Sequence, residues 1–486
     1  MHVVDMVYFW ARTVPQHAAI IRPEGIVTYG ALADSVETAA ESFGRSILDR
    51  DKPVAVAIAS AAGMLVASLG LLRAGFNIVP ISKNLLEHLP QTGATTLVCE
   101  RGGVMLDAGT NILFEDSWIT VGARASQRQK TLGRRPVGDP YSIFFTSGTT
   151  GKPKPIVQTQ AAWEQRVLFS NNSVFSSYER ALIVPGLSNA YGFNRVFEIL
   201  HAGKTACFAP FGQPMLWLAN TYDIDLIIAS IQQAVALADI QEKITRYSLP
   251  ALKTLRIGGS VITRDGIERL KAHLCRNIIL SYASTEAGTA AMAPYDAIAH
   301  IPGAVGQVFP GVEIEIVDHL GATLPIGSEG FIRLRSPQFI KNFGVNDTST
   351  WFYPGDLGSL TPDGVLCVMG RSGDVINRGG AKFSSTDFEG FLTACTGVKD
   401  AGICTHTGTA GFEEIWVGVV LEPSIDLAAF RRYIESDSQF GTNIDKLFVV
   451  QSIPRNELGK IQQVQLKEML QSIYEDSPRT PDQRGD

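Results

Sequence analysis

The chain has 486 residues, of which 45% are hydrophobic and 19% charged, and its 42 basic and 48 acidic side chains leave a net charge of −6. A mildly acidic chain has no general electrostatic attraction to nucleic acid or anionic membranes, so we expect neither as a partner. The length exceeds what one hydrophobic core usually organises, and we expect at least two domains. The cysteines lack C-x-x-C spacing, which favours buried free thiols over a zinc site; they are Cys99, Cys207, Cys275, Cys367, Cys395 and Cys404.

Two segments bear on membranes and targeting. The stretch Met1–Met6 lacks a basic region followed by an apolar core, so no secretory signal is expected and a cytoplasmic location follows by default. The uncharged segment Val54–Leu72 approaches the length of a transmembrane helix. Its serines and glycines favour a short strand, Val54–Ile58, followed by a helix that ends near Gly75. We therefore expect no membrane span.

Short apolar runs alternate with helix-like stretches through the first 300 residues, which predicts an α/β fold of βα units layered on mostly parallel sheets. The predicted strands are Val54–Ile58, Thr96–Cys99, Tyr141–Phe145, Ala181–Val184, Leu226–Ala229, Leu255–Ile257 and Ile278–Leu280. The predicted helices between them are Gln160–Val167, Ala190–His201 and Arg264–Leu274. No internal repeat or low-complexity tract is visible.

The composition and predicted secondary structure of the chain change twice in its second half. After about Gly303, strands separated by glycine-rich turns predict a smaller β-rich subdomain over residues 303–370, with strands at Val312–Val317, Gly330–Leu334 and Val365–Met369. We expect an N-terminal domain over residues 1–371 and a small α/β C-terminal domain over residues 372–476. Its predicted elements are the helices Ser385–Thr393 and Gln462–Ile473 and the strands Trp416–Val420 and Leu447–Val450. The polar tail 477–486 is expected to be disordered.

A strand followed by a flexible, basic loop is the feature around which the rest is organised. Ile143–Phe145 predicts a buried strand, and the loop that follows combines hydroxyls, glycines and two lysines: Thr146, Ser147, Gly148, Thr149, Thr150, Gly151, Lys152 and Lys154. Small residues let backbone N–H groups approach an anion, so this loop predicts a phosphate site. A P-loop is disfavoured, because Thr146 replaces its first glycine and Pro153 its Mg²⁺-binding hydroxyl, and because Pro153 opposes a helix start at Lys152.

Other polar motifs follow predicted strands further along the chain. Leu255–Ser260 places Gly258, Gly259 and Ser260 at a strand end, and Ser281–Glu286 follows the next strand. Each motif alone is also compatible with an ordinary strand edge and helix cap. Trp351–Gly358 and Gly370–Asp374 are in the same way compatible with turns, since Pro-Gly-Asp and Ser-Gly-Asp are strong turn formers.

Taken in order, these motifs resemble those of the adenylate-forming (AMP-binding) superfamily: acyl- and aryl-CoA synthetases, nonribosomal-peptide adenylation domains and luciferases. Thr146–Lys154 resembles the phosphate-binding signature, and Ser281–Glu286 resembles the motif Tyr-Gly-x-Thr-Glu, with Ala283 in place of glycine. The resemblance implies that Tyr282 lies against adenine, Thr285 contacts the α-phosphate and Glu286 holds Mg²⁺. It also implies an ATP-dependent enzyme.

The resemblance extends to the C-terminal motifs. Asp356 would grip the ribose hydroxyls, although Tyr353 and Pro354 depart from the usual pattern, and Arg371 would bind ribose or phosphate. Pro454–Gln462 resembles the terminal loop whose lysine, here Lys460, reaches the substrate carboxylate and the α-phosphate. Gly373 would be the hinge of a mobile C-terminal domain, and Gly379 and Gly380 would border a channel for a pantetheine thiol.

The implied reaction is activation of a carboxylic acid to an acyl-adenylate with release of pyrophosphate, followed by transfer to the thiol of coenzyme A. Loading of a separate carrier protein is the alternative, and a non-catalytic nucleotide- or acyl-binding relative is the alternative from another class. A P-loop kinase or ATPase would instead release the γ-phosphate. The expected acyl pocket is formed by Asn189, Gly259, Ala287 and Gly288. Asn189 resembles the asparagine of aryl-acid-activating members, which favours an aryl or small polar acid, but it is equally compatible with a helix cap.

Overall fold

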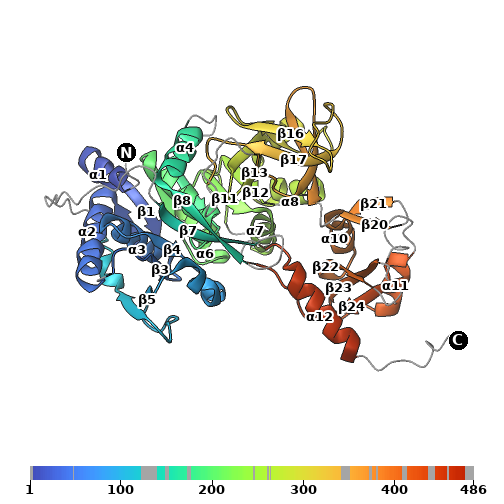
Figure 1. Ribbon diagram of the computed structural model, residues 1–486, viewed down its shortest axis with the longest axis horizontal. Helices are drawn as coiled ribbons and strands as arrows, with labels where there is room; N and C mark the ends of the chain where they lie inside the picture. Colours follow the sequence, from blue (N-terminus) through green and yellow to red (C-terminus); the bar gives the residue numbers. More distant parts are fainter. Residues whose placement is uncertain are drawn as a thin grey trace.

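The computed structural model describes residues 4–47, 49–121, 140–147, 153–171, 177–244, 247–259, 262, 264–340, 351–371, 375–378, 381–407, 413–435, 444–456 and 459–476. The molecule is elongated, with the described residues up to 371 in one layered body and those from 375 to 476 at one end (Figure 1).

A six-stranded sheet, counted over the described residues, occupies the N-terminal end of this body. Its order is β6-β5-β3-β4-β7-β8, and all neighbours are parallel except β7 and β8. The strands are β3 (Val54–Ala57), β4 (Ile78–Pro80), β5 (Thr96–Glu100), β6 (Thr110–Phe114), β7 (Pro140–Ser147) and β8 (Pro153–Thr159). Buried Val, Ile, Leu and Phe side chains recur along these strands, as expected for a sheet covered on both faces.

The second sheet has thirteen strands in the described chain, in the order β16-β17-β18-β19-β15-β14-β13-β12-β11-β9-β10-β1-β2. Parallel pairing links β1, β10, β9, β11, β12 and β13, and antiparallel pairing takes over from β14. The strands are β1 (Ala18–Arg22), β2 (Gly25–Thr28), β9 (Arg180–Ile183), β10 (Thr205–Cys207), β11 (Leu226–Ser230), β12 (Thr254–Gly258), β13 (Ile278–Ser284), β14 (Gly288–Pro294), β15 (Ala304–Val308), β16 (Glu313–Val317), β17 (Gly330–Arg335), β18 (Asp356–Leu360) and β19 (Val365–Arg371).

Helices fill the space between and around the two sheets. They are α1 (Asp5–Thr13), α2 (Tyr29–Ser46), α3 (Ala61–Arg73), α4 (Gln160–Asn171), α5 (Ala190–His201), α6 (Gln213–Thr221), α7 (Ile231–Lys243), α8 (Arg264–His273) and α9 (Tyr295–Ile298), with short 3₁₀ turns at Lys83–Thr92 and Asp116–Trp118. One buried cluster joins α2, α3 and α5 to strands of both sheets, including Val56 of β3, Phe144 of β7 and Ala181 of β9. This cluster fixes α5 between the sheets, where it carries several polar residues discussed below.

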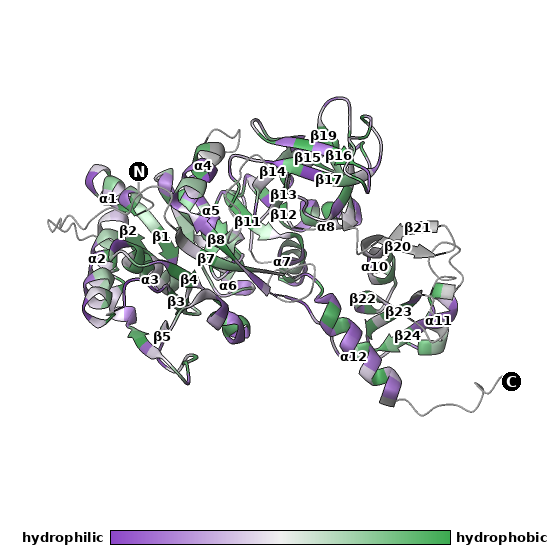
Figure 2. Ribbon diagram, viewed as in Figure 1, coloured by the Kyte–Doolittle hydropathy of each residue, from purple (hydrophilic) through white to green (hydrophobic). Residues whose placement is uncertain are grey.

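The described residues of the last part of the chain form a separate three-stranded sheet, β22-β23-β24, from Val398–Thr407, Glu413–Leu421 and Lys446–Val449. It lies beside the small hairpin β20–β21 (Val375–Arg378 and Ala381–Ser384). Helices α10 (Ser385–Ala394), α11 (Leu427–Glu435) and α12 (Gln463–Asp476) cover the sheet. Figure 2 shows hydrophilic and hydrophobic residues along α12, whose Leu466 and Leu470 are buried against Trp416. Amphipathicity of this kind is typical of a helix packed on one side of a sheet.

The predicted α/β fold is confirmed, and the predicted strands and helices are present with ends shifted by a few residues. Val54–Leu72 is a strand followed by a helix, as predicted, and within the described residues no helix is long and apolar enough to cross a membrane. All six cysteines are buried, and none of them forms a disulfide. The residues after Gly303 do not form a sheet of their own, because β15 pairs with β14 and with β19 and so continues the large sheet.

Candidate active site

The predicted phosphate loop lies at the tip of an antiparallel hairpin. β7 and β8 pair so that Thr146 is opposite Lys154 and Ser147 is opposite Pro153. Gly148 to Lys152 lie outside the described residues, whereas Lys154 is exposed beside them. A P-loop would continue from its strand directly into a helix. Here a second strand follows and α4 begins only at Gln160, so the chain does not have the P-loop connection.

Two glycines stand at the carboxyl end of β12. A Cβ at Gly258 would lie 2.6 Å from the carbonyl oxygen of Ser281 on the neighbouring strand β13, so no side chain fits there. Gly259 has φ +97°, which other residues rarely adopt. Gly258 is thus packed against β13, whereas Gly259 is exposed, so the backbone just after β12 carries no side chain that would keep a ligand away. Ser260 lies outside the described residues.

Tyr282 and Asp356 meet across 74 residues of sequence. The Tyr282 hydroxyl donates a hydrogen bond to the Asp356 carboxylate, which opens β18. Asp356 is also opposite Arg371 in the β18–β19 pairing, which brings a third motif to the same place. The prediction that Ser281–Glu286 follows a strand needs correction, because β13 continues to Ser284 and includes Tyr282. The parallel part of the large sheet thus meets its antiparallel part at the predicted nucleotide site.

The turn that carries Thr285 and Glu286 is fixed by residues that the sequence did not single out. Arg166 of α4 is buried, and its Nη2 donates to the Thr285 carbonyl oxygen over 2.6 Å. The Ile340 N–H donates to the Glu286 carbonyl oxygen over 2.7 Å, and Gln338 donates through Nε2 to the Thr289 carbonyl oxygen. These contacts leave both motif side chains half-buried at the site. The sequence shows only an arginine on a predicted helix, and the partner of this arginine is 119 residues away.

Gln338 also explains one of the predicted acyl-pocket residues. Gly288 has φ +72°, and a Cβ built on it would lie 2.5 Å from Gln338 Oε1. Ala287 before it is fully buried, and its N–H donates to the Ser284 hydroxyl. Both small residues are therefore required by packing as well as by any pocket.

Asn189 serves as the cap of helix α5. Its Oδ1 accepts a hydrogen bond of 2.9 Å from the Gly192 N–H, whereas its buried Nδ2 has no partner among the described residues. Asn189 can thus be both a helix cap and an acyl-pocket residue, because the cap uses only the side-chain oxygen. The amide N–H₂ remains as a donor for a bound molecule.

The loop that carries Lys460 is a tight turn held by Arg455 and Asn456. The Lys460 N–H donates to Asn456 Oδ1 over 2.9 Å, and the Asn456 N–H donates to the Lys460 carbonyl oxygen over 2.8 Å. Arg455 donates to both carboxylate oxygens of Asp400 and, through Nη1, to the Gly459 carbonyl oxygen. The turn is therefore fixed to β22 of the C-terminal sheet.

This turn contacts the large sheet's helices directly. A Cβ built on Gly459 would lie 2.6 Å from Gln232 Cβ at the start of α7, so the backbone of the turn touches that helix. A Cβ built on Gly259 would lie 4.0 Å from Lys460 Cε. The Lys460 side chain therefore lies over the open end of β12, in the same region as the motifs on β13 and β18.

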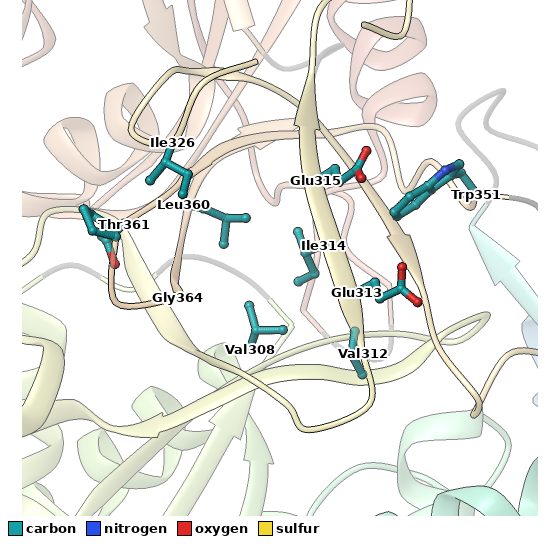
Figure 3. Close-up of a pocket in the computed structure, with 11 residues that line it drawn as sticks. Val308, Val312, Glu313, Ile314, Glu315, Ile326, Trp351, Leu360, Thr361 and Gly364 are labelled. Carbon is teal, nitrogen blue, oxygen red and sulfur yellow. The ribbon is translucent and has the colours of Figure 1, made fainter. Parts of the chain in front are cut away.

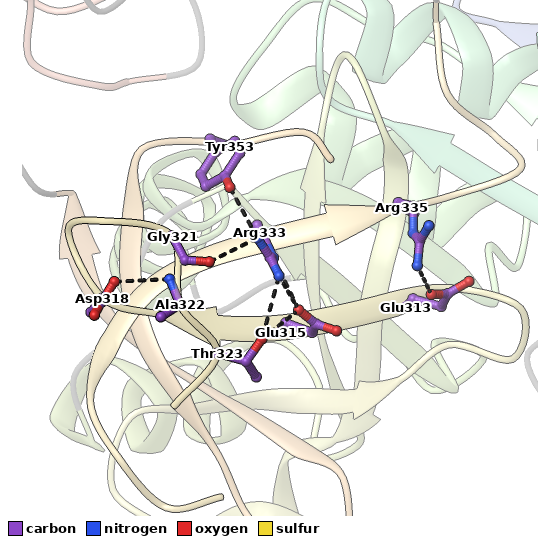
Figure 4. A network of polar contacts seen from close by, with 9 residues as sticks. All are labelled: Glu313, Glu315, Asp318, Gly321, Ala322, Thr323, Arg333, Arg335 and Tyr353. Atoms are coloured by element: carbon purple, nitrogen blue, oxygen red, sulfur yellow. Dashed lines mark hydrogen bonds and ion pairs between the residues drawn. The ribbon is translucent and has the colours of Figure 1, made fainter. Parts of the chain in front are cut away.

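The segment before Asp356 is anchored by a polar network on the β16–β17 hairpin (Figure 4). Arg333 donates to Glu315, Thr323, the Gly321 carbonyl oxygen and the Tyr353 hydroxyl. The guanidinium carbons of Arg333 and Arg335 lie 4.6 and 4.1 Å from the Trp351 ring centroid, a cation–π arrangement. Tyr353, which departs from the usual family residue, thus helps to hold the strand that presents Asp356.

A shallow cavity of about 430 Å³ lies beside this network (Figure 3). Among the described residues it is lined by Val308, Val312, Glu313, Ile314, Glu315, Ile326, Trp351, Leu360, Thr361, Pro362 and Gly364. It includes none of the predicted site residues, and its lining lacks the converging polar groups found around β12 and β13.

Several predicted residues cannot be placed. The hinge Gly373 and the channel residues Gly379 and Gly380 lie outside the described residues, as does the side chain of Arg371. No cluster of three metal-ligating side chains occurs within the described residues. Mg²⁺ in nucleotide sites is commonly bound by one or two carboxylates together with substrate phosphates, and the half-buried Glu286 fits that donor set.

Comparison with known proteins agrees with this geometry. The model of the AMP-binding enzyme family matches residues 8–343, so the chain belongs to that family. Among curated relatives, it is 25% identical to the pseudomonine synthase PmsE of Pseudomonas entomophila over 96% of this chain and 83% of the relative. It is also 25% identical to the 2-succinylbenzoate–CoA ligase of Listeria monocytogenes (67% and 69% covered). For the 4-coumarate–CoA ligase CCL1 of Humulus lupulus, 26% identical, the chain spans less than two thirds of the relative, 63%.

Solved structures confirm the fold. The O-succinylbenzoate coenzyme A synthetase MenE of Bacillus subtilis, solved with ATP and magnesium ion, superposes with a TM-score of 0.80 at 21% identity, over 95% of this chain and 99% of that one. MatB of Rhodopseudomonas palustris, bound to ATP, gives 0.79 at 21% identity, over 98% and 100%. The amide bond synthetase McbA of Marinactinospora thermotolerans gives 0.77 at 19% identity, over 96% and 99%.

Proposed function

We propose that this protein is an ATP-dependent ligase that activates a carboxylic acid as its acyl-adenylate, releases pyrophosphate, and passes the acyl group to the thiol of coenzyme A. The convergence of Tyr282, Asp356 and Lys460 at the carboxyl ends of β12 and β13 carries this proposal. These residues come from three separate motifs, and they meet where an α/β sheet usually binds its ligands.

Each of these groups has a proposed role in the first half-reaction. The substrate carboxylate attacks the α-phosphorus of ATP, the bond to the bridging oxygen breaks, and pyrophosphate leaves with that electron pair. Lys460 neutralises charge on the carboxylate and α-phosphate oxygens in transit, and Thr285 donates to the α-phosphate. The hairpin loop Thr146–Lys154 holds the departing phosphates. Mg²⁺, with Glu286 as its protein ligand, would supply further charge neutralisation on those phosphates.

The nucleoside is held by the two residues that already touch. Tyr282 provides an aromatic face for adenine, and Asp356 has two acceptor oxygens for the two ribose hydroxyls. Arg371 lies opposite Asp356 in the strand pairing and is proposed to assist at the ribose or phosphate. In the second half-reaction a thiolate attacks the acyl carbonyl and AMP leaves. The hinge at Gly373 and the channel beside Gly379 and Gly380 are proposed for that step.

A separate carrier protein is the second candidate acceptor. The acceptor thiol in both cases would be delivered on the same pantetheine arm, so the first half-reaction does not distinguish them.

The decisive experiment measures acid-dependent release of pyrophosphate from ATP across aryl, alkyl and amino acids, with and without coenzyme A. Release with a particular acid and an acyl-CoA of the expected mass support the proposal. Release without any acyl-CoA favours the carrier protein. Lys460→Ala should lower the rate of adenylation by at least 100-fold, whereas Lys399→Ala, at an exposed position of the same C-terminal sheet, should leave it unchanged. Full adenylation by Lys460→Ala would contradict the assignment of this lysine.

A further inference from the structure

A cluster of buried charges lies between α5 and the large sheet. Arg195 and Glu198 of α5 and Arg256 of β12 are 6%, 6% and 9% exposed. Arg195 pairs with Glu198 at 2.5 Å, but none of the ion pairs formed by the described residues includes Arg256. One carboxylate therefore faces two guanidinium groups. The cluster carries a net positive charge in a region that excludes water.

The neighbouring groups do not neutralise that charge. Burial raises the pKa of both Tyr178 and Tyr191, so the two phenols beside the arginines stay uncharged. Asp225, the next carboxylate, accepts hydrogen bonds from the Glu179 and Arg180 N–H groups and faces Lys253 at 3.6 Å. Burial, followed by the nearby Arg195, lowers the pKa of Arg256 to about 10, as expected for an uncompensated cation.

Several donors of this cluster also lack acceptors. Arg256 Nη2 makes a long hydrogen bond of 3.4 Å to Thr289 Oγ1, whereas Arg256 Nε has no partner among the described residues. The same is true of Nε and Nη1 of Arg195 and of the Tyr191 hydroxyl. A buried donor without an acceptor destabilises the folded protein, and a charged one does so more strongly. Such a group of donors is what an anionic ligand would satisfy.

The cluster lies next to the predicted acyl pocket. Arg256 and Gly258 are two residues apart on β12 and so lie on the same face of the sheet. Thr289, which contacts Arg256, directly follows the pocket residues Ala287 and Gly288 on the chain. Tyr191 and Arg195 belong to the helix that Asn189 caps. The pocket therefore has Lys460 at its nucleotide end and a cationic group of donors behind it.

We propose that the substrate acid carries a second anionic group, such as a second carboxylate, and that Arg256, assisted by Arg195 and Tyr191, binds it. The inference rests on the proposed adenylation. The far carboxylate anchors the acid in the pocket, and the near carboxylate remains beside Gly259 and Lys460 for attack on ATP. The guanidinium fork of Arg256 suits a carboxylate, with which it can form two parallel hydrogen bonds.

The test compares each diacid with its own monomethyl ester, which differs only in the charge of one end. Pyrophosphate release is measured for the C3–C6 aliphatic diacids and the three benzenedicarboxylic acids, each with its ester. We expect at least one diacid to exceed its ester about 10- to 100-fold in kcat/KM, the range for losing a charged hydrogen bond. Arg256→Met should abolish that preference, and Arg256→Lys should keep part of it, because the charge stays while the fork is lost.

Arg264→Met, at an exposed position on α8, is the matched control and should keep the full preference. Equal use of diacids and esters by the unaltered protein would overturn the inference while its pyrophosphate release still supports adenylation. A preference that persists in Arg256→Met would also overturn it. If Arg256→Met fails to fold, the comparison of each diacid with its ester, made with the unaltered protein, still tests the inference. Absence of acid-dependent release across monoacids and diacids alike would contradict adenylation itself, and the inference with it.

Discussion

The Tyr282 hydroxyl donates a hydrogen bond to the Asp356 carboxylate, and this contact joins the end of the parallel part of the large sheet to its antiparallel part. The tyrosine lies on β13, and the aspartate is the first residue of β18. If both hold the nucleoside, they should act as a coupled pair.

We therefore expect Tyr282→Phe to lower kcat/KM for ATP about 10-fold, because the ring remains while a hydrogen bond to a charged group, about 1.5–3 kcal/mol, is lost. Asp356→Ala should lower it further, and the double variant should lose less than the sum of the two effects. Steady-state pyrophosphate release measures all three. Tyr474→Phe, at an exposed position on α12, is the control and should change little. Additive effects of the pair would argue against a shared role.

The second prediction concerns the contact between Gly459 and Gln232. Gly459→Ala places a methyl group 2.6 Å from Gln232 Cβ and puts alanine at φ +80°, so the Lys460 turn can no longer approach α7 as it does here. Adenylation should slow at least 10-fold, while thioester formation from pre-formed acyl-adenylate should be unaffected. Single-turnover measurements of each half-reaction provide the comparison.

Gly327→Ala is the matched control for that substitution. Gly327 has φ +86°, similar to that of Gly459, but a Cβ there meets nothing within 4 Å. It therefore reproduces the backbone strain without the steric contact. Equal losses of adenylation in both variants would show that the approach of the turn to α7 is irrelevant to the first half-reaction.

The third prediction tests Arg166 as a positioning residue. Arg166→Met leaves the Thr285 carbonyl oxygen without its 2.6 Å donor in a buried place, so we expect the free energy of unfolding to fall by about 1–3 kcal/mol. Adenylation should slow because the turn that carries Glu286 loosens. Urea titration and pyrophosphate release measure the two effects. Arg101→Met, whose side chain is 83% exposed, should change stability by less than about 0.5 kcal/mol.

The fourth prediction concerns pH. Burial lowers the pKa of His201, at the end of α5, below its usual 6.5. The unfolded chain then binds a proton more readily than the folded one, so the free energy of unfolding should fall as pH drops through 6.5. His201→Gln should reduce that slope relative to the unaltered protein. Urea titrations at pH 8, 7, 6 and 5 check it, and an unchanged slope would show that another group is responsible.

Local patterns were sufficient to predict much of the fold. Ala190–His201 was predicted with the bounds that the structure has, because its N-cap and apolar spacing are local signals. The continuation of the large sheet through β14, β15 and β19 was missed, since strand pairing over long separations leaves no local trace.

The site was predictable where the family motifs carry it and not where it depends on tertiary contacts. Motif order indicated Tyr282, Asp356 and Lys460, but not that the first two would be hydrogen-bonded. Arg166 and Gln338 lie in no motif, and Arg256 lies within Leu255–Ser260 without being singled out, because each of the three acts through contacts that are distant in sequence.

The groups proposed to hold the nucleoside and the proposed catalytic lysine are carried on different sheets. Tyr282 and Asp356 belong to one continuous ladder of strands, whereas the Lys460 turn is tied through Arg455 to β22 of the C-terminal sheet. If the Lys460 turn moved away, Tyr282 and Asp356 would consequently stay in place to hold the adenylate. An enzyme built in this way can keep its reactive intermediate in place while it changes the chemistry performed on it, so that the two half-reactions are ordered in time without an intervening release.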